Sequence, residues 1–162
     1  MNIVRISAVA AQECVRQQVG LDRVGMLINA YHTMQECVDI VPSDPRCPIT
    51  AYGMLWIAKV LEPSNGGKFR KTPVTFANGG SSCNPSAIEQ ATVRHFDMID
   101  VMGREQNTID EWVRHFLWIH PLSDGNGRMA WIMYNWLNNT MDEPVNLPDF
   151  FGEGVDTDRA KH

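Results

Sequence analysis

The chain has 162 residues, a length that suits one domain with a substantial buried core. Its 44% of hydrophobic and 20% of charged residues are typical of a globular protein and exclude a disordered or fibrous chain. A formal net charge of −5 argues against a dedicated nucleic-acid-binding protein, because such proteins usually carry a basic face. We therefore expect a single domain over residues 1–162 that binds no nucleic acid.

The N-terminal segment, residues 1–11, is fairly apolar, but Arg5 interrupts it and it is too short for the core of a signal peptide. No run approaches the roughly 20 apolar residues of a membrane span. We read the segment as an ordinary first helix and expect a cytoplasmic protein without membrane contact. The four cysteines show no CxxC pair, so we expect free thiols, although four cysteines also allow two disulfides.

Helical periodicity runs through the N-terminal third, over residues 5–18 and again over 22–37. Residues 41–48 contain three prolines, which exclude a helix and indicate a stiff connection. Thr50 is then placed to cap a third helix that ends before Pro63.

The only convincing strand material lies at residues 68–76, between two glycine-rich loops at 64–67 and 78–82. This stretch is rich in β-forming residues on both sides of a turn-like Lys-Thr-Pro centre. It therefore predicts one short β-hairpin.

The C-terminal half returns to helical patterns. Asn84 and Pro85 have the pattern of an N-cap and a first-turn proline. Residues 108–111 form a capping-box pattern, which predicts the start of a helix that runs toward His120. Residues 129–137 are apolar nearly all round, so we expect this helix to be the buried centre. The chain as a whole predicts a mainly α fold with one small hairpin.

The most informative stretch is HPLSDGNGR, residues 120–128, directly before this last helix. A glycine turn at a helix start attracts phosphate groups, because the first amides are unpaired and the positive end of the helix dipole lies there. We therefore predict that phosphate is bound by Gly125, Asn126, Gly127 and Arg128.

Two more residues of this stretch suit phosphoryl chemistry. His120 is a proton acceptor for a hydroxyl that attacks phosphorus, and Asp124 can hold Mg²⁺ on a nucleotide's phosphates. Each residue also has a plainer interpretation: a core histidine, an N-cap carboxylate, a tight glycine turn, and a surface salt bridge for Arg128. Their combination within nine residues favours a phosphoryl- or nucleotidyl-transfer site.

This order of residues resembles the signature of the Fic-domain (Fic/Doc) family, His-Pro-Phe-x-Asp/Glu-Gly-Asn-Gly-Arg-x-x-Arg, and seven positions agree. Leu122 replaces the Phe of the signature, and Trp131 replaces its second arginine. The resemblance covers about residues 50–139 and implies a compact Fic-like helical bundle with one small β-hairpin flap.

The resemblance also implies a function: transfer of AMP from Mg-ATP to a Ser, Thr or Tyr hydroxyl of a target protein. His120 would be the catalytic base and Asp124 the metal ligand. The hairpin flap would hold an extended segment of the protein substrate by strand addition. The flap residues expected to dock the target are Phe69, Arg70, Lys71, Thr72 and Val74. The basic pair Arg70 and Lys71 could instead admit an anionic donor, or be ordinary exposed residues.

Trp131 leaves the choice of donor open, because in the family the matching arginine secures the terminal phosphate of ATP. One alternative is slow AMP transfer, and Trp131→Arg should then raise activity with ATP. Another is a different donor nucleotide or group, with transfer of UMP, phosphate or phosphocholine. The third is a nucleotide- or protein-binding module without catalysis.

Many Fic proteins are restrained by a glutamate that pairs with the second arginine. The nearest match is Glu153 within residues 149–154, but the first residue of that pattern is wrong. Trp131 also leaves no arginine for such a glutamate to engage. We predict no intramolecular inhibition of this type, and a separate inhibitor chain stays open.

Overall fold

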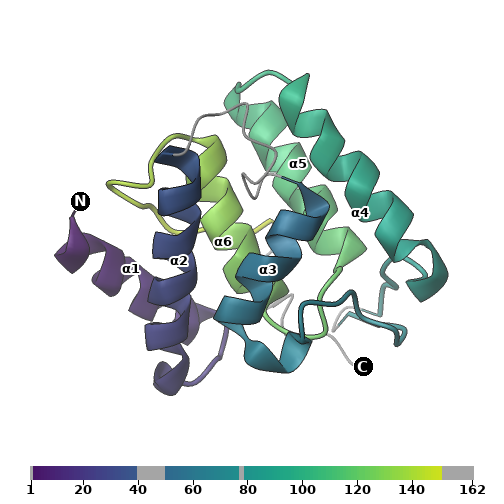
Figure 1. Cartoon of the computed structure of the whole chain (residues 1–162), viewed down its shortest axis with the longest axis horizontal. Helices are drawn as coiled ribbons and strands as arrows, with labels where there is room; N and C mark the ends of the chain where they lie inside the picture. Colours follow the sequence, from purple (N-terminus) through teal and green to yellow (C-terminus); the bar gives the residue numbers. More distant parts are fainter. Residues whose placement is uncertain (1, 40–49, 77–78, 151–162) are drawn as a thin grey trace.

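The computed structural model describes residues 2–39, 50–76 and 79–150. These residues form a mainly α-helical fold, as predicted, with six α-helices and no β-sheet within the described ranges (Figure 1). The α-helices are α1 (Ile3–Arg16), α2 (Val24–Asp39), α3 (Ala51–Leu61), α4 (Ile88–Asp97), α5 (Gln106–Ile119) and α6 (Asn126–Leu137). Short 3-10 helices occupy Leu21–Arg23, Pro63–Asn65, Pro85–Ala87 and Met98–Asp100.

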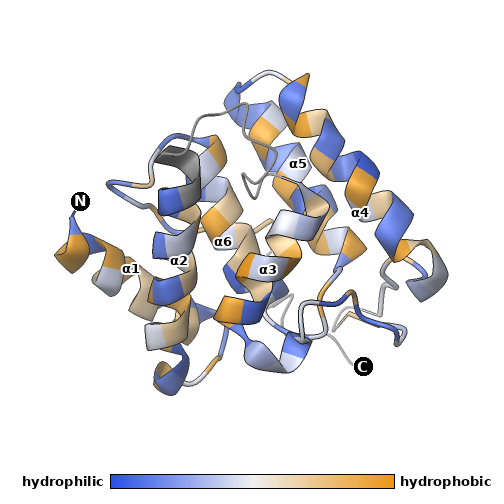
Figure 2. Cartoon of the chain, viewed as in Figure 1, coloured by the Kyte–Doolittle hydropathy of each residue, from blue (hydrophilic) through white to orange (hydrophobic). Residues whose placement is uncertain are grey.

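Helix α6 runs through the centre of the fold and packs against α1, α2 and α5 (Figure 1). All of its residues except Trp136 are buried, which confirms the prediction from its apolar sequence. The surrounding helices are amphipathic, and Figure 2 shows hydrophobic and hydrophilic residues alternating along α4 and α5. The glycine turn of the motif is therefore anchored to the most buried helix of the described chain.

Side-chain caps mark the starts of α1 and α3. The Thr50 side chain accepts the backbone N–H of Gly53 at 3.0 Å, so the predicted cap of α3 is confirmed. Asn84 accepts the N–H of Ser86 at 3.0 Å, but it opens a short 3-10 turn, and α4 begins only at Ile88.

The predicted start of α5 at the capping box was three residues late. The helix begins at Gln106, and the carbonyl of Glu105 accepts the first helical N–H from Ile109 at 3.0 Å. The Gln106 side chain bonds to Asp110 one turn later at 2.7 Å, which stabilises this earlier first turn.

The predicted hairpin is not found among the described residues. The one antiparallel bridge within the described residues joins Thr75 to Ser81, and residues 68–73 contain no strand. The chain reverses after Phe76, where Gly79 has a φ of +88°, rather than at the Lys-Thr-Pro centre. We call residues 69–76 and 79–83 the flap segment; it is a loop with one bridge rather than a two-stranded flap.

Residues after α6 fold back over the bundle. The side-chain amide of Asn135 bonds the backbone of Val145 twice: its oxygen accepts the N–H at 2.9 Å, and its nitrogen donates to the carbonyl at 3.1 Å. The Trp131 indole donates to the same carbonyl at 2.8 Å. On the opposite side, the buried Glu13 carboxylate accepts the N–H of Leu147, which ties the segment to α1.

Two further expectations can be compared with the described residues. Cys14 and Cys83 are buried as thiols, whereas the side chains of Cys37 and Cys47 lie outside the described part. None of the described helices has the length and apolar character needed to cross a membrane.

Candidate functional site

The motif begins where α5 ends. His120 is the C-cap of α5 and adopts a left-handed conformation (φ +53°, ψ +60°), with its N–H donating to the Phe116 carbonyl at 3.0 Å. This conformation costs a residue with a Cβ about 1–2 kcal/mol, so surrounding contacts must hold it. Pro121 follows and cannot continue the helix. The chain therefore turns sharply from α5 into the motif loop.

Arg70 supplies those surrounding contacts. Its side chain is only 2% exposed, and its backbone N–H donates to the Pro121 carbonyl at 2.9 Å. Desolvation by burial lowers the pKa of its guanidinium. The guanidinium donates to one hydroxyl and four carbonyl oxygens, those of Ser82, Thr72, Cys83, Ile119 and His120. The expectation that Arg70 docks a target or donor at the surface is therefore wrong, because its hydrogen bonds are made inside the protein.

The other flap residues divide between core and surface. Val74 is buried, so it presents no side chain to a target. Phe69 is half-buried with its ring edge-on to Tyr52 at 6.4 Å between centroids. Lys71 and Thr72 are exposed, and their proposed contact with a protein substrate stays a prediction.

The flap segment covers the candidate base. The Phe76 ring lies edge-on to the His120 imidazole, with centroids 5.5 Å apart and planes at 83°. His120 is 1% exposed in this arrangement. A substrate hydroxyl can therefore reach the imidazole only after the covering groups move.

The glycine turn is closed as well. Gly125 has a φ of +84° at the start of α6, and its N–H donates to the Asp124 carboxylate at 2.8 Å. A Cβ at this glycine would lie 3.1 Å from the Leu61 side chain and 3.4 Å from the Arg128 guanidinium. The expected outward, unpaired amide is therefore wrong for Gly125, whose amide is already paired. Asn126 and Gly127 are buried beside it, and phosphate binding by these residues stays a prediction.

Two asparagines hold the motif loop by its backbone. Asn126 accepts the N–H of Leu122 and donates to its carbonyl, both at 2.9 Å. Asn65 accepts the N–H of Asp124 at 3.0 Å and donates to its carbonyl at 2.9 Å. Asn65 was not anticipated from the sequence, because an asparagine beside two glycines is typical of any loop.

Arg128 is the most buried member of an ionic cluster beside the glycine turn. One guanidinium nitrogen is 3.4 Å from Glu62 and the other is 3.2 Å from Asp124, while Glu62 also pairs with Arg23 at 3.1 Å. The Nε of Arg128 is buried and has no hydrogen-bond partner among the described residues. Arg23 also lies 3.9 Å from Asp22, so two arginines and three carboxylates are linked. The Nε–H of Arg128 is left for a further acceptor, such as an anion. Glu62 was not anticipated from the sequence.

Comparison with known protein families identifies the family of this chain. The model of the Fic/DOC family matches residues 48–137, which is more than half of the chain. The chain belongs to the Fic/DOC family. No curated protein matches it. Fic proteins are generally transferases that move nucleotide or similar groups onto proteins, so a transferase is the class of enzyme indicated.

Asp124 could hold the Mg²⁺ expected of a Fic protein only if phosphate oxygens supplied further ligands. No group of three or more His, Cys, Asp or Glu residues within the described ranges could hold a metal ion. The Asp124 side chain is 52% exposed, in contrast to the buried Arg128. Mg²⁺ is commonly bound by one or two carboxylates, with phosphates and water completing its shell. A single exposed carboxylate beside a glycine turn at a helix start fits that pattern, and metal binding by Asp124 stays a prediction.

Trp131 is a core residue in this Fic protein. It is fully buried, and its ring stacks on Tyr31 with centroids 5.0 Å apart and planes at 30°. Its indole N–H is taken by the Val145 carbonyl. Residue 131, where the signature has its second arginine, is therefore surrounded by packed side chains. This argues against the expected gain in activity with ATP from Trp131→Arg. Glu153 lies outside the described residues.

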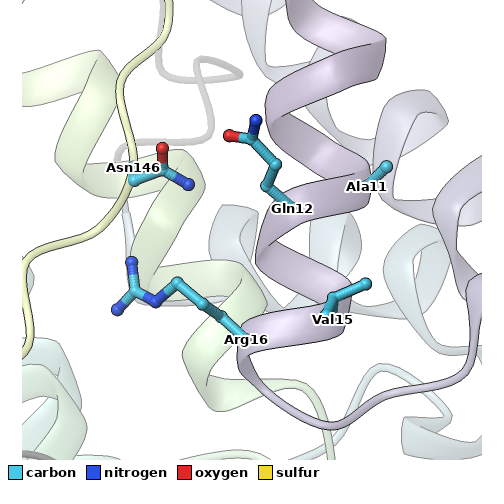
Figure 3. A pocket seen from close by; sticks show the side chains of 5 residues that line it. All are labelled: Ala11, Gln12, Val15, Arg16 and Asn146. Atoms are coloured by element: carbon cyan, nitrogen blue, oxygen red, sulfur yellow. The ribbon is translucent and has the colours of Figure 1, made fainter.

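A surface hollow of about 530 Å³ lies away from the motif, between α1 and the segment after α6 (Figure 3). Gln12, Arg16 and Asn146 reach toward one another across it. Arg16 is already bonded to Glu13 and to the Leu147 carbonyl. This hollow contains none of the residues singled out in the motif.

Proposed function

We propose that this Fic protein transfers AMP from Mg-ATP to a Ser, Thr or Tyr hydroxyl of a cytoplasmic target protein. One observation carries the proposal. His120 at the end of α5 and the Asp124-Gly125 turn at the start of α6 are joined by one short loop, in a chain of the Fic/DOC family. The base, the metal ligand and the phosphate-binding turn of the proposed reaction thus share one loop.

In the proposed reaction, the target hydroxyl oxygen attacks the α-phosphorus of ATP in line with the leaving group. His120 takes the hydroxyl proton, and the bond from the α-phosphorus to the bridging oxygen breaks to release pyrophosphate. Asp124 would hold Mg²⁺ against the donor phosphates, where the ion supplies charge neutralisation. Arg128 and the amides of residues 125–127 would bind the phosphate oxygens.

The closed arrangement implies two rearrangements on substrate binding. Phe76 must uncover His120, because the imidazole is otherwise shielded from a hydroxyl. Donor phosphate must also compete with the Asp124 carboxylate for the N–H groups of Gly125 and Arg128. Both changes involve contacts of the motif loop, which lies between α5 and α6.

A second candidate keeps the site and changes the donor. Trp131 is buried and uncharged where the family uses an arginine on the terminal phosphate of ATP. This observation favours a donor that needs no contact with a charged side chain at position 131. UMP, phosphate or phosphocholine transfer are the corresponding reactions.

The test is a transfer assay with several labelled donors, Mg²⁺ and a cell lysate. The wild-type protein is compared with His120→Ala and with His115→Ala, a matched control that removes an exposed histidine of the same helix region. Label from ATP that is lost only in His120→Ala supports AMP transfer, and label from another donor supports the second candidate. If no donor labels any protein, or if His120→Ala transfers as well as the wild type, the proposal is wrong.

A further inference from the structure

One buried side chain, that of Arg70, joins the flap segment to the motif. On the motif side its guanidinium donates to the carbonyls of Ile119 at 3.1 Å and of His120, and its backbone N–H donates to Pro121 at 2.9 Å. On the flap side it donates to the Cys83 carbonyl at 2.6 Å. Three consecutive carbonyls around the candidate base are thus held by a residue about 50 positions earlier in the chain.

An arginine is needed for this arrangement. Its planar fork carries five donors in fixed directions, and here it serves oxygens on both sides of the contact. No ion pair to Arg70 occurs among the described residues, so its charge is met by carbonyl dipoles and the Ser82 hydroxyl. A buried cation without a carboxylate partner is unfavourable for stability alone. This observation favours a role for Arg70 beyond packing.

We propose that Arg70 is a positioning residue for the transfer reaction. It holds the backbone of His120 in the left-handed conformation and thereby sets the direction of the imidazole. The inference rests on the proposed function, in which His120 is the base. A left-handed conformation is unfavourable for a residue with a Cβ, so it persists only while surrounding contacts enforce it.

The kinetic consequence follows from geometry. A general base must lie within hydrogen-bond reach of the proton that it removes, and a displacement of about 1 Å can lower a rate by about 10²-fold. Arg70 is buried, and its guanidinium contacts backbone carbonyls at the end of α5 rather than the glycine turn. Its removal should therefore lower kcat and leave the KM for the donor nearly unchanged.

The experiment compares Arg70→Met with Arg16→Met, a matched arginine that also donates to a backbone carbonyl but lies at α1. Arg70→Lys is the milder variant, because it keeps the charge and can still reach one carbonyl. Steady-state kinetics are measured with the labelled donor below the unfolding temperature of every variant. The Cε1–H NMR signals of the five histidines are recorded in parallel, with His120→Ala assigning the signal of interest.

The expected result for Arg70→Met is a fall in kcat of at least about tenfold, a KM for the donor within about twofold of the wild type, and a shifted or broadened His120 signal. Arg16→Met should leave both readouts unchanged, and Arg70→Lys should fall between the two. If Arg70→Met fails to fold, a shifted His120 signal in Arg70→Lys supports the proposal and an unchanged one overturns it. An unmoved His120 signal in folded Arg70→Met overturns it too.

Different results would contradict the proposed transfer reaction and the positioning role of Arg70. If the wild-type protein transfers no group from any donor, the proposed function fails, while the His120 signal still decides whether Arg70 positions the imidazole. If transfer is robust and Arg70→Met raises only the KM, the proposed function stands and the positioning role is wrong.

Discussion

The side-chain amide of Asn65 brackets the backbone of Asp124, accepting its N–H at 3.0 Å and donating to its carbonyl at 2.9 Å. The two residues are 59 positions apart, so this contact fastens the motif loop to the turn after α3. Asn126 brackets Leu122 in the same way, and Asn135 does so in the segment after α6. Paired asparagine contacts, rather than strands, fix the irregular backbone around the site.

Asn65→Asp tests this relationship with little change of volume. The substitution removes the donor to the Asp124 carbonyl and places a carboxylate oxygen against it, so we expect the free energy of unfolding to fall by about 1–3 kcal/mol. Urea unfolding measures it. The control is Asn84→Asp, an exposed cap at which either residue is an equally good acceptor. Equal stability losses in the two variants would contradict a stabilising role for the paired hydrogen bonds between Asn65 and Asp124.

Gly125→Ala tests the close approach at the glycine turn. A Cβ there would lie 3.1 Å from Leu61 and would occupy a left-handed backbone, so we expect a loss of about 1–3 kcal/mol. The matched variant is Gly25→Ala on the surface of α2, where a Cβ meets nothing within 4 Å. That variant should gain up to about 1 kcal/mol from the higher helix propensity of alanine. Thermal unfolding of both proteins distinguishes strain from a general intolerance of glycine substitution.

Phe76→Ala tests whether the flap segment shields His120. Removal of the ring that lies edge-on to the imidazole should speed the modification of His120 by diethyl pyrocarbonate several-fold. Mass spectrometry of the peptide that carries His120 gives the rate. Phe69→Ala is the control, because its ring contacts Tyr52 instead. A rate in Phe76→Ala no faster than in the control would show that other groups cover the imidazole.

Local signals in the sequence were sufficient for most of the helices. The cap at Thr50 and the apolar run of α6 were correctly interpreted, because each depends on neighbouring residues. The hairpin predicted over residues 68–76 is not found, because these β-forming residues do not pair with one another; the one bridge among the described residues joins Thr75 to Ser81. Tertiary contacts engage this backbone instead: the Arg70 N–H donates to the Pro121 carbonyl, outside any local pairing.

The residues of the site also divide into those that local sequence signals reveal and those that only tertiary contacts bring together. The motif could be recognised in the sequence because its functional residues follow one another closely, from His120 to Arg128. Glu62 and Asn65 were not, because they reach the motif from a separate helix end. Arg70 was assigned to the surface because an arginine among loop residues is usually exposed, and only the fold brings four backbone carbonyls around it.

Trp131→Arg tests whether the second arginine of the family could be restored. The position is fully buried against Tyr31, so we expect an unpaired buried charge to lower the free energy of unfolding by about 3 kcal/mol or more, without a gain in activity. Trp131→Phe keeps the stack and loses the bond to Val145, which should cost about 1 kcal/mol. Trp118→Arg, at an exposed tryptophan, is the control and should be nearly neutral. Increased transfer from ATP by a stable Trp131→Arg protein would contradict this expectation.

His95 should make the stability of the fold depend on pH. Its imidazole donates to the Trp112 carbonyl at 2.7 Å and stacks on the Trp112 ring, and desolvation by burial lowers its pKa from 6.5 to about 4. Between these values the unfolded chain binds a proton that the folded chain excludes. Stability conferred by this histidine is therefore complete above about pH 6.5 and is lost as the pH falls toward 4.

His95→Gln removes that proton uptake. We expect the slope of unfolding free energy against pH, between about pH 4.5 and 6, to decrease by up to about 1.4 kcal/mol per pH unit, since one fewer proton is bound on unfolding. Above pH 7 the variant should be less stable than the wild type, because the stack on Trp112 is lost. Trp112→Phe is the control: it removes the indole bond to the His95 carbonyl but keeps the histidine, so it should lower stability at every pH and retain the slope. Parallel slopes for the wild type and His95→Gln in urea titrations would show that His95 is not the group that titrates.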